Sequence, residues 1–227
     1  MKRLVALAVA ACISGTAIGA DFYPIAGASS STGGSDLWPA SNLIQGPGVG
    51  FDAAEPHAKI LGGADGNWVT AADAGFPSDY IEQVGQPVLT FDLGSDVALN
   101  EISVWGYAAT NSNGASEFTL KFSTAAEGAG GGSASAGPFA LAGDLTLGTN
   151  DDTSRQSFSY DMVTARYVEM TITDNFFNAP GDGSVAGSIA GGDRAGLGEV
   201  AFQQVPEPSS VILALLGSLA LMRFRKR

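Results

Sequence analysis

The sequence predicts an all-β protein built as an antiparallel β-sandwich with Gly-rich connecting loops. Apolar and polar side chains alternate with a period of two through the middle of the chain. The 31 glycines and 10 prolines interrupt the chain throughout, and no stretch of the body keeps a long helical period. Such alternation is typical of strands that bury one face, as the strands of a two-layer sandwich do.

Six segments carry the alternation and are predicted to be strands. In the first, Leu89, Phe91 and Leu93 share one face while Thr90 and Asp92 share the other. The six segments, in chain order, are residues 88–93, 102–106, 118–123, 158–160, 168–173 and 200–202.

The segments outside these strands are poorer in strand signals. Residues 123–137 are low in complexity and are predicted to form a flexible loop, while residues 182–198 are Gly-rich but carry Val185 and Ile189. We expect Trp68 and Trp105 in the core and at its edge. The apolar residues before residue 62 are expected to cover one end of the sandwich; they include Ile25, Leu37, Leu43, Ile44, Ile60 and Leu61.

The charge of the chain restricts its partners. Between the two terminal segments, residues 21–205 carry 5 basic and 22 acidic side chains, a net charge of −17. A body this acidic repels phosphate backbones, so nucleic acid is not an expected partner.

Few residues are available for catalysis. The only cysteine, Cys12, lies in the N-terminal segment, and the only histidine, His57, lies in a loop-like stretch without a Gly-x-Ser-x-Gly motif. The sequence therefore predicts no catalytic residues. A hydrolase that uses acidic residues remains as an alternative.

The N-terminus has the layout of a secretory signal peptide over residues 1–20. Lys2 and Arg3 precede an apolar stretch, and small residues suited to cleavage end it at Gly19 or Ala20. Export by the Sec machinery is the expected consequence. A lipoprotein signal ending at Cys12 is the alternative reading.

The C-terminus, residues 205–227, has three parts. Pro206, Glu207 and Pro208 come first, residues 211–222 are apolar or small, and a basic tail ends the chain: Arg223, Arg225, Lys226 and Arg227. An apolar helix this short spans only about 20 Å of the roughly 30 Å hydrocarbon core, and its basic end stays cytoplasmic.

This arrangement resembles the PEP-CTERM sorting signal of Gram-negative bacteria that make exopolysaccharide. The resemblance implies processing by exosortase near Pro206–Pro208, transient anchoring of the precursor in the inner membrane, and a mature protein at the cell surface or outside the cell. An ordinary tail anchor is the alternative.

The body, residues 21–204, resembles a second family. Residues 39–46, 67–70, 89–94, 102–107, 166–168 and 198–202 follow one another in the order found in discoidin, or coagulation factor five/eight C-terminal, domains. Carbohydrate-binding modules of family 32 share this galactose-binding-like jelly roll. The chain departs from the pattern at Gln45, where a carboxylate is usual, and by an insertion at residues 47–66.

The second resemblance implies two kinds of site. A structural Ca²⁺ is expected beside an N-terminal turn and a late glutamate, which places Glu199, Asn42, Asp52 and Thr70 as ligands. A sugar site needs an exposed aromatic face with polar groups beside it, on loops at one end of the sandwich. The candidates are Trp38, Phe76, Tyr80, Asn175, Phe176, Phe177, Asn178 and Arg194.

Taken together, the sequence predicts an exported, non-enzymatic surface or extracellular-matrix protein that engages exopolysaccharide or another glycan through its loops. The alternative is a purely structural or adhesive component of the envelope or biofilm without a defined sugar pocket.

Overall fold

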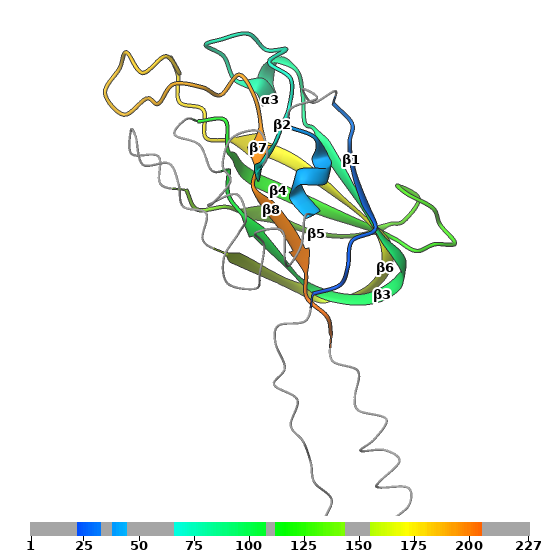
Figure 1. Cartoon of the computed structure of the whole chain (residues 1–227). Helices are drawn as coiled ribbons and strands as arrows, with labels where there is room; N and C mark the ends of the chain where they lie inside the picture. Colours follow the sequence, from blue (N-terminus) through cyan, green and yellow to red (C-terminus); the bar gives the residue numbers. More distant parts are fainter. Residues whose placement is uncertain (1–21, 33–37, 45–65, 108–111, 144–154, 206–227) are drawn as a thin grey trace, which may run out of the picture.

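The computed structural model describes residues 22–32, 38–44, 66–107, 112–143 and 155–205 (Figure 1). Its elements are β1 (Gly27–Ser30), η1 (Ala40–Ile44), β2 (Trp68–Val69), α3 (Tyr80–Gln83), β3 (Val88–Trp105), β4 (Ala115–Ser123), β5 (Ala134–Ala140), β6 (Gln156–Asn175), β7 (Gly196–Leu197) and β8 (Glu199–Phe202). The predicted helices at both termini lie outside the described residues.

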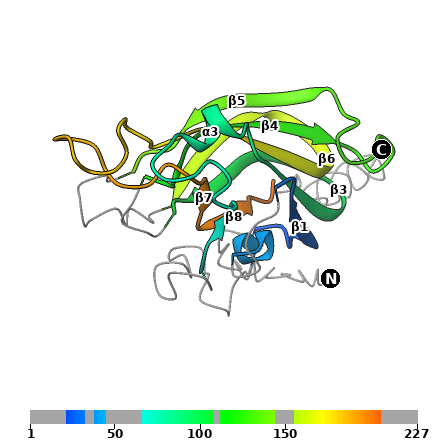
Figure 2. The same ribbon diagram turned by 90° about the horizontal axis from the view of Figure 1, so that it is seen from above.

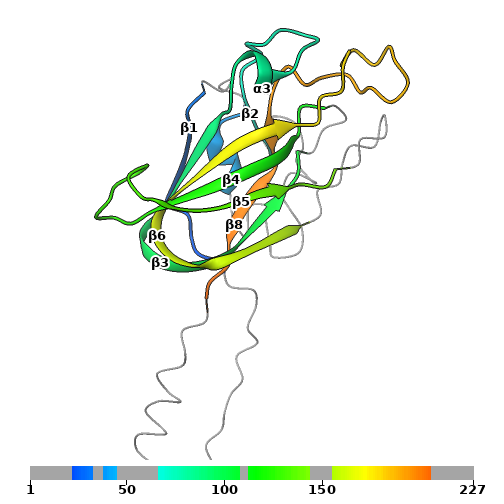
Figure 3. The same cartoon turned by 180° about the vertical axis from the view of Figure 1, so that it is seen from behind.

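The strands form an antiparallel sandwich. The main sheet has the order β1-β3-β6-β4-β5, with β8 also paired to β3, and β2 and β7 form a small second sheet. Viewed from above, β4 and β5 lie in one layer, while β8 and β1 lie across from them (Figure 2). Figure 3 shows the molecule from behind, and in this view β4, β5 and β6 lie nearest the viewer. The predicted antiparallel β-sandwich is confirmed.

Two long strands connect the layers. The start of β3 pairs with β1, and its end, residues 102–105, pairs with β8. The first half of β6 pairs with β3 alone, and its second half also pairs with β4. The pairing of β3 with β6 shifts in register between Asp92 and Val97, where both strands turn from one layer into the other. Segments predicted as separate strands, 88–93 with 102–106 and 158–160 with 168–173, are therefore halves of β3 and β6.

The prediction of a flexible loop over residues 123–137 is wrong at its end. Strand β5 begins at Ala134 and pairs with β4, so the connection is shorter than expected. Its sequence, ASAGPFA, carries little strand signal because small residues fill an exposed edge. The strand forms because β4 offers it a hydrogen-bonding partner, which local composition does not reveal.

Aromatic side chains fill the space between the layers. The ring of Phe118 lies 5.4 Å from that of Phe158 at 87°, and Phe91 meets Phe202 at 5.8 Å and 70°. Edge-to-face pairs at these distances are favourable, and burying each ring contributes about 1.5–3 kcal/mol. Trp68 and Trp105 are fully buried, as the sequence predicts.

The two ends of the body meet on one side of the sandwich. Phe22 forms an antiparallel bridge with Gln203, and the Tyr23 N–H donates to the Phe202 carbonyl at 2.9 Å. Figure 1 shows this meeting point at the end of the sandwich opposite β2, β7 and α3. The segment that leads to residue 205 therefore leaves the body at the far end from those elements.

Candidate functional site

The end of the sandwich that carries β2, β7 and α3 gathers most of the predicted sugar-site residues. Two hydrogen bonds join Thr70 to Ala195: the Thr70 N–H donates to the Ala195 carbonyl at 2.9 Å, and the Ala195 N–H donates to the Thr70 hydroxyl at 3.0 Å. The Tyr80 N–H donates to the Gly192 carbonyl at 2.7 Å. The start of α3 and residues 192–195 are thus held together. We call the surface that they form with Trp38 and the turn 74–79 the loop end.

At the loop end, Trp38 and Arg194 are in contact. The Arg194 guanidinium carbon lies 5.2 Å from the centroid of the Trp38 ring, and Arg194 Nε is 3.9 Å from a carboxylate oxygen of Asp193. The Arg194 side chain is 27% exposed. A guanidinium placed over an indole is held by cation–π attraction and keeps its planar set of donors oriented.

Asn175 fixes the backbone that carries this pair. Its buried side-chain amide donates to the carbonyls of Gly192 at 2.9 Å and Arg194 at 3.1 Å, and its oxygen accepts from the Phe177 N–H at 3.0 Å. The predicted role of Asn175 as a direct sugar contact does not fit this position, because both ends of its amide bind protein. Asn175 instead positions Arg194.

The remaining predicted aromatics are packed rather than presented. Tyr80 is fully buried, so its ring offers no exposed face, which corrects its assignment; burial also raises the pKa of its phenol. The Phe177 ring lies against the backbone of Gly181 and Gly192, where a Cβ atom would have no room. Phe176 packs in the same way against Gly143. These rings are needed to pack the loops.

Phe76 is exposed to solvent at the loop end, with 59% of its surface accessible. It lies in a short turn in which the Ser78 hydroxyl donates to the Ala74 carbonyl at 3.0 Å. Asp79 then caps α3 by accepting from the Ile81 N–H at 2.9 Å and the Glu82 N–H at 3.3 Å. The turn that carries Phe76 is therefore tied to the helix that follows it.

Sequence reasoning missed Asp193. It is nine-tenths buried and lies between Gly192 and Arg194 in a Gly-rich stretch that carries no recognisable motif. Only its position beside Arg194 in the sequence hinted at a role. Together, Trp38, Asp193 and Arg194 supply an aromatic surface, a hydrogen-bond acceptor and a set of donors, which is the chemistry that sugar hydroxyls and ring faces require.

The predicted calcium ligands lie on elements that pack together. Helix η1, which carries Asn42, contacts β2 and β8; Thr70 follows β2, and Glu199 begins β8. Glu199 is buried, the Asn42 amide donates to the Asn67 carbonyl at 2.7 Å, and the Thr70 hydroxyl accepts from Ala195. A carboxylate, an amide and a hydroxyl oxygen fit a hard cation. Asp52 lies outside the described residues.

Two further observations concern metals and membranes. In the part of the chain that the structure describes, no three His, Cys, Asp or Glu side chains are grouped as a metal site would require. Within the same ranges, no helix has the length and apolar character needed to cross a membrane. The sorting residues Pro206, Glu207 and Pro208 and the basic tail lie outside those ranges.

Comparison with protein families identifies the C-terminal segment. Residues 204–227 match the PEP-CTERM protein-sorting motif, which confirms the sorting signal predicted from the sequence. No curated protein matches the chain.

Solved structures similar to the chain include sugar-binding modules. The family 32 carbohydrate-binding module of Clostridium perfringens NanJ, in complex with galactose, is 12% identical, with a TM-score of 0.46 over 78% of this chain and 91% of that one. Another module from Clostridium perfringens, in complex with GalNAc-β-1,3-galactose, is 14% identical, with a TM-score of 0.49 over 81% and 99%. A Streptococcus pneumoniae fucose-binding module is 11% identical, with a TM-score of 0.47 over 81% and 95%.

Proposed function

We propose that the chain is an exported, non-enzymatic surface protein that binds a neutral glycan at its loop end. The observation that carries the proposal is the contact of Trp38 with Arg194, beside Asp193, at the end of the sandwich opposite its two termini. The aromatic ring suits the apolar face of a sugar, and the charged pair suits its hydroxyl groups. Phe76 adds an exposed ring at the same end, beside the half-buried ring of Trp38.

The position of the sorting motif supports this orientation. The motif begins at residue 204, where the body ends beside Phe22. A protein held at its C-terminus would present the loop end away from its point of attachment. We propose that exosortase releases the precursor from the inner membrane and that the mature form acts at the cell surface or outside the cell.

The charge of the body favours a neutral ligand. Residues 21–205 carry 22 acidic and 5 basic side chains, so the field around the protein opposes polyanions such as uronic-acid polymers at low ionic strength. Calcium bound by Glu199, Asn42 and Thr70 would hold η1, β2 and β8 together beneath the loop end. Its role would be to stabilise the fold, and it would take no part in catalysis.

An array of neutral and anionic oligosaccharides, followed by calorimetric titration of each hit, tests the proposal. Arg194→Ala should weaken binding of the neutral ligand at least tenfold. Arg155→Ala is the matched control, because Arg155 also lies over an aromatic ring, that of Phe22 at 5.0 Å, but near the termini. Binding that Arg194→Ala leaves intact would contradict the loop-end site. If no glycan binds, with or without calcium, the alternative of a purely structural protein is supported.

A further inference from the structure

A cleft separates two strand edges on the side of the sandwich away from β1. One edge is β5, which pairs only with β4; the other is the first half of β6, which pairs only with β3 among the described strands. The cleft between them has a volume of about 500 Å³. This is within the range of small-molecule sites, about 300–1,000 Å³.

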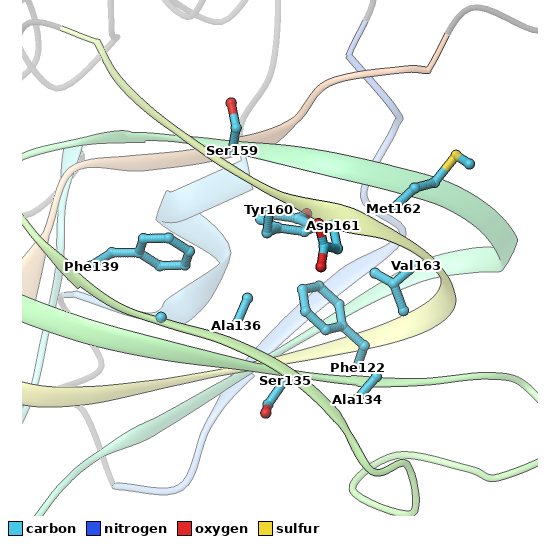
Figure 4. Close-up of a pocket in the computed structure, with 11 residues that line it drawn as sticks. Phe122, Ala134, Ser135, Ala136, Phe139, Ser159, Tyr160, Asp161, Met162 and Val163 are labelled. Atoms are coloured by element: carbon cyan, nitrogen blue, oxygen red, sulfur yellow. The ribbon is translucent and has the colours of Figure 1, made fainter.

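Aromatic rings form the floor of this cleft. Figure 4 shows Phe122, Phe139 and Tyr160 directed into the space between the two strands, with Ser135 and Ser159 pointing away from it. The rings of Phe122 and Tyr160 lie 5.0 Å apart at an interplanar angle of 40°. Asp161, Met162 and Val163 line the β6 side.

Each strand carries a β-bulge where it borders the cleft. Asn100 of β3 faces three residues of β6, Tyr160–Met162, because the register shifts between Leu99 and Glu101. On the other edge, Thr119 of β4 faces both Gly137 and Pro138 of β5. Gly137 has φ +103°, a backbone conformation that favours glycine. Bulges redirect side chains and commonly border binding sites.

The same bulges make the two edges poor partners for another strand. Pro138 has no N–H to donate, and each bulge breaks the regular spacing that an added strand would need. Asp161 places a carboxylate on the second edge. These features favour an occupant that does not require a continuous ladder of backbone hydrogen bonds.

The chemistry of the lining identifies the kind of occupant. No lysine, arginine or histidine is among the eleven residues that line the cleft, and the body is strongly acidic, so anionic ligands are disfavoured. Aromatic rings bind the apolar faces of sugar rings, while a carboxylate and unpaired backbone groups bind hydroxyls. Met162, 70% exposed at the rim, adds apolar surface.

We propose that this cleft between β5 and β6 is a second glycan-binding site that takes a neutral oligosaccharide, independently of the loop end. Tyr160 and Phe139 would contact the sugar rings, and Asp161 would accept hydrogen bonds from their hydroxyls. Two separate sites on one domain would let the protein engage a polysaccharide at two points and gain affinity by multivalency.

The experiment uses the full-length chain in a zwitterionic detergent that contains no sugar. Neutral hexose and N-acetylhexosamine oligosaccharides are screened on an array, and the hits are titrated by calorimetry. Ala134→Trp places an indole at the cleft wall, and Ala140→Trp is the matched control, because Ala140 is another exposed alanine of β5 and does not line the cleft. Asp161→Ala is a second, smaller test that removes only a surface carboxylate.

We expect Ala134→Trp and Asp161→Ala to weaken one neutral oligosaccharide at least tenfold, while Ala140→Trp leaves its affinity unchanged. If Ala134→Trp lowers the melting temperature, a loss of binding in that variant could come from destabilisation. The affinity of Asp161→Ala then decides whether the cleft binds the oligosaccharide. Loss of this binding in Arg194→Ala but not in the cleft variants would support the loop end and overturn the cleft. Loss in the cleft variants but not in Arg194→Ala would support the cleft and contradict the loop end.

Three other results would also overturn the cleft proposal. They are a lack of binding to any neutral oligosaccharide, binding of polyuronate instead of neutral sugars, and self-association of the chain that Ala134→Trp abolishes. The last result, measured by sedimentation velocity, would assign the two edges to a second copy of the chain.

Discussion

The guanidinium of Arg194 lies over the ring of Trp38, 5.2 Å from its centroid, although the two residues are far apart in the sequence. Trp38 lies two residues before the start of η1, and Arg194 lies two residues before the start of β7. The two residues meet through β2, because the Val69 N–H donates to the Trp38 carbonyl at 3.4 Å and Val69 pairs with Gly196, two residues after Arg194.

Arg194→Lys tests whether the shape of the guanidinium matters beyond its charge. Lysine keeps the positive charge but loses the planar group that stacks on Trp38 and donates from a fixed geometry. We expect glycan affinity to fall severalfold, less than for Arg194→Ala, with little change in melting temperature. Calorimetric titration measures the difference. Equal affinity of Arg194→Lys and wild type would show that charge alone is needed.

Asn175→Ala should destabilise the fold by about 1–3 kcal/mol, because it removes the side-chain donor to the Arg194 carbonyl, one of the two donors to the Gly192 carbonyl, and the acceptor of the Phe177 N–H. Chemical denaturation measures the free energy of unfolding. Asn178→Ala is the matched control in the same loop, since Asn178 is exposed, and should change stability by less than about 0.5 kcal/mol. Similar effects of the two substitutions would contradict the bracing role of Asn175.

The pair of Asp92 and Arg166 makes stability depend on pH. Arg166 Nε and a terminal nitrogen donate to the two carboxylate oxygens of Asp92 at 2.8 and 2.9 Å, and these hydrogen bonds lower the pKa of Asp92. A lowered folded-state pKa means that the stabilisation is complete above the unfolded value, about 3.9, and is lost as pH falls through the folded value.

Asp92→Asn should therefore lower the melting temperature at pH 7 and have progressively less effect below about pH 4. Because the side chains of Arg166 and Asp92 are 32% and 33% exposed, the effect should be about 1 kcal/mol or less. Thermal scans of wild type and Asp92→Asn, each with and without Arg166→Gln, give the coupling of the pair. If the coupling free energy is the same at pH 7 and at pH 3, the pair of Asp92 and Arg166 is not a source of pH-dependent stability.

If Glu199 holds a calcium ion, calcium should raise the melting temperature. Binding to the native state alone stabilises it by roughly 2.7 kcal/mol at a concentration one hundred times Kd. Glu199→Gln should abolish most of that shift, whereas Glu82→Gln, a change on α3, should leave it intact. Identical melting curves in calcium and in chelator would remove the ion from the proposal.

The sorting motif predicts where the mature protein ends. We expect a C-terminus near Pro206–Pro208, without the basic tail, in protein recovered from outside the inner membrane. A strain without exosortase, or with Glu207→Ala, should accumulate the full-length form in the inner membrane, since the basic tail fixes its orientation. Mass spectrometry of the mature protein provides the measurement. An intact Arg227 terminus at the surface of the wild-type strain would favour an ordinary tail anchor.

The features that depend on local pattern could be predicted from the amino-acid sequence. Period-two alternation located the cores of β3, β4, β6 and β8, because a strand with one buried face must alternate in this way. The sorting motif is a contiguous segment and could be recognised without knowledge of the fold. The burial of Trp68 and Trp105 also followed from their large apolar side chains.

The features that depend on contacts between residues distant in the sequence could not be predicted in this way and were found only in the folded chain. Strand β5 exists because β4 pairs with it, and Tyr80 is buried because the residues around Gly192 close over the start of α3. The cleft is formed by two strand edges that belong to different layers of the sandwich. Burial and strand pairing depend on long-range contacts. A local sequence pattern does not show which distant segments will pack together, so it does not predict these features.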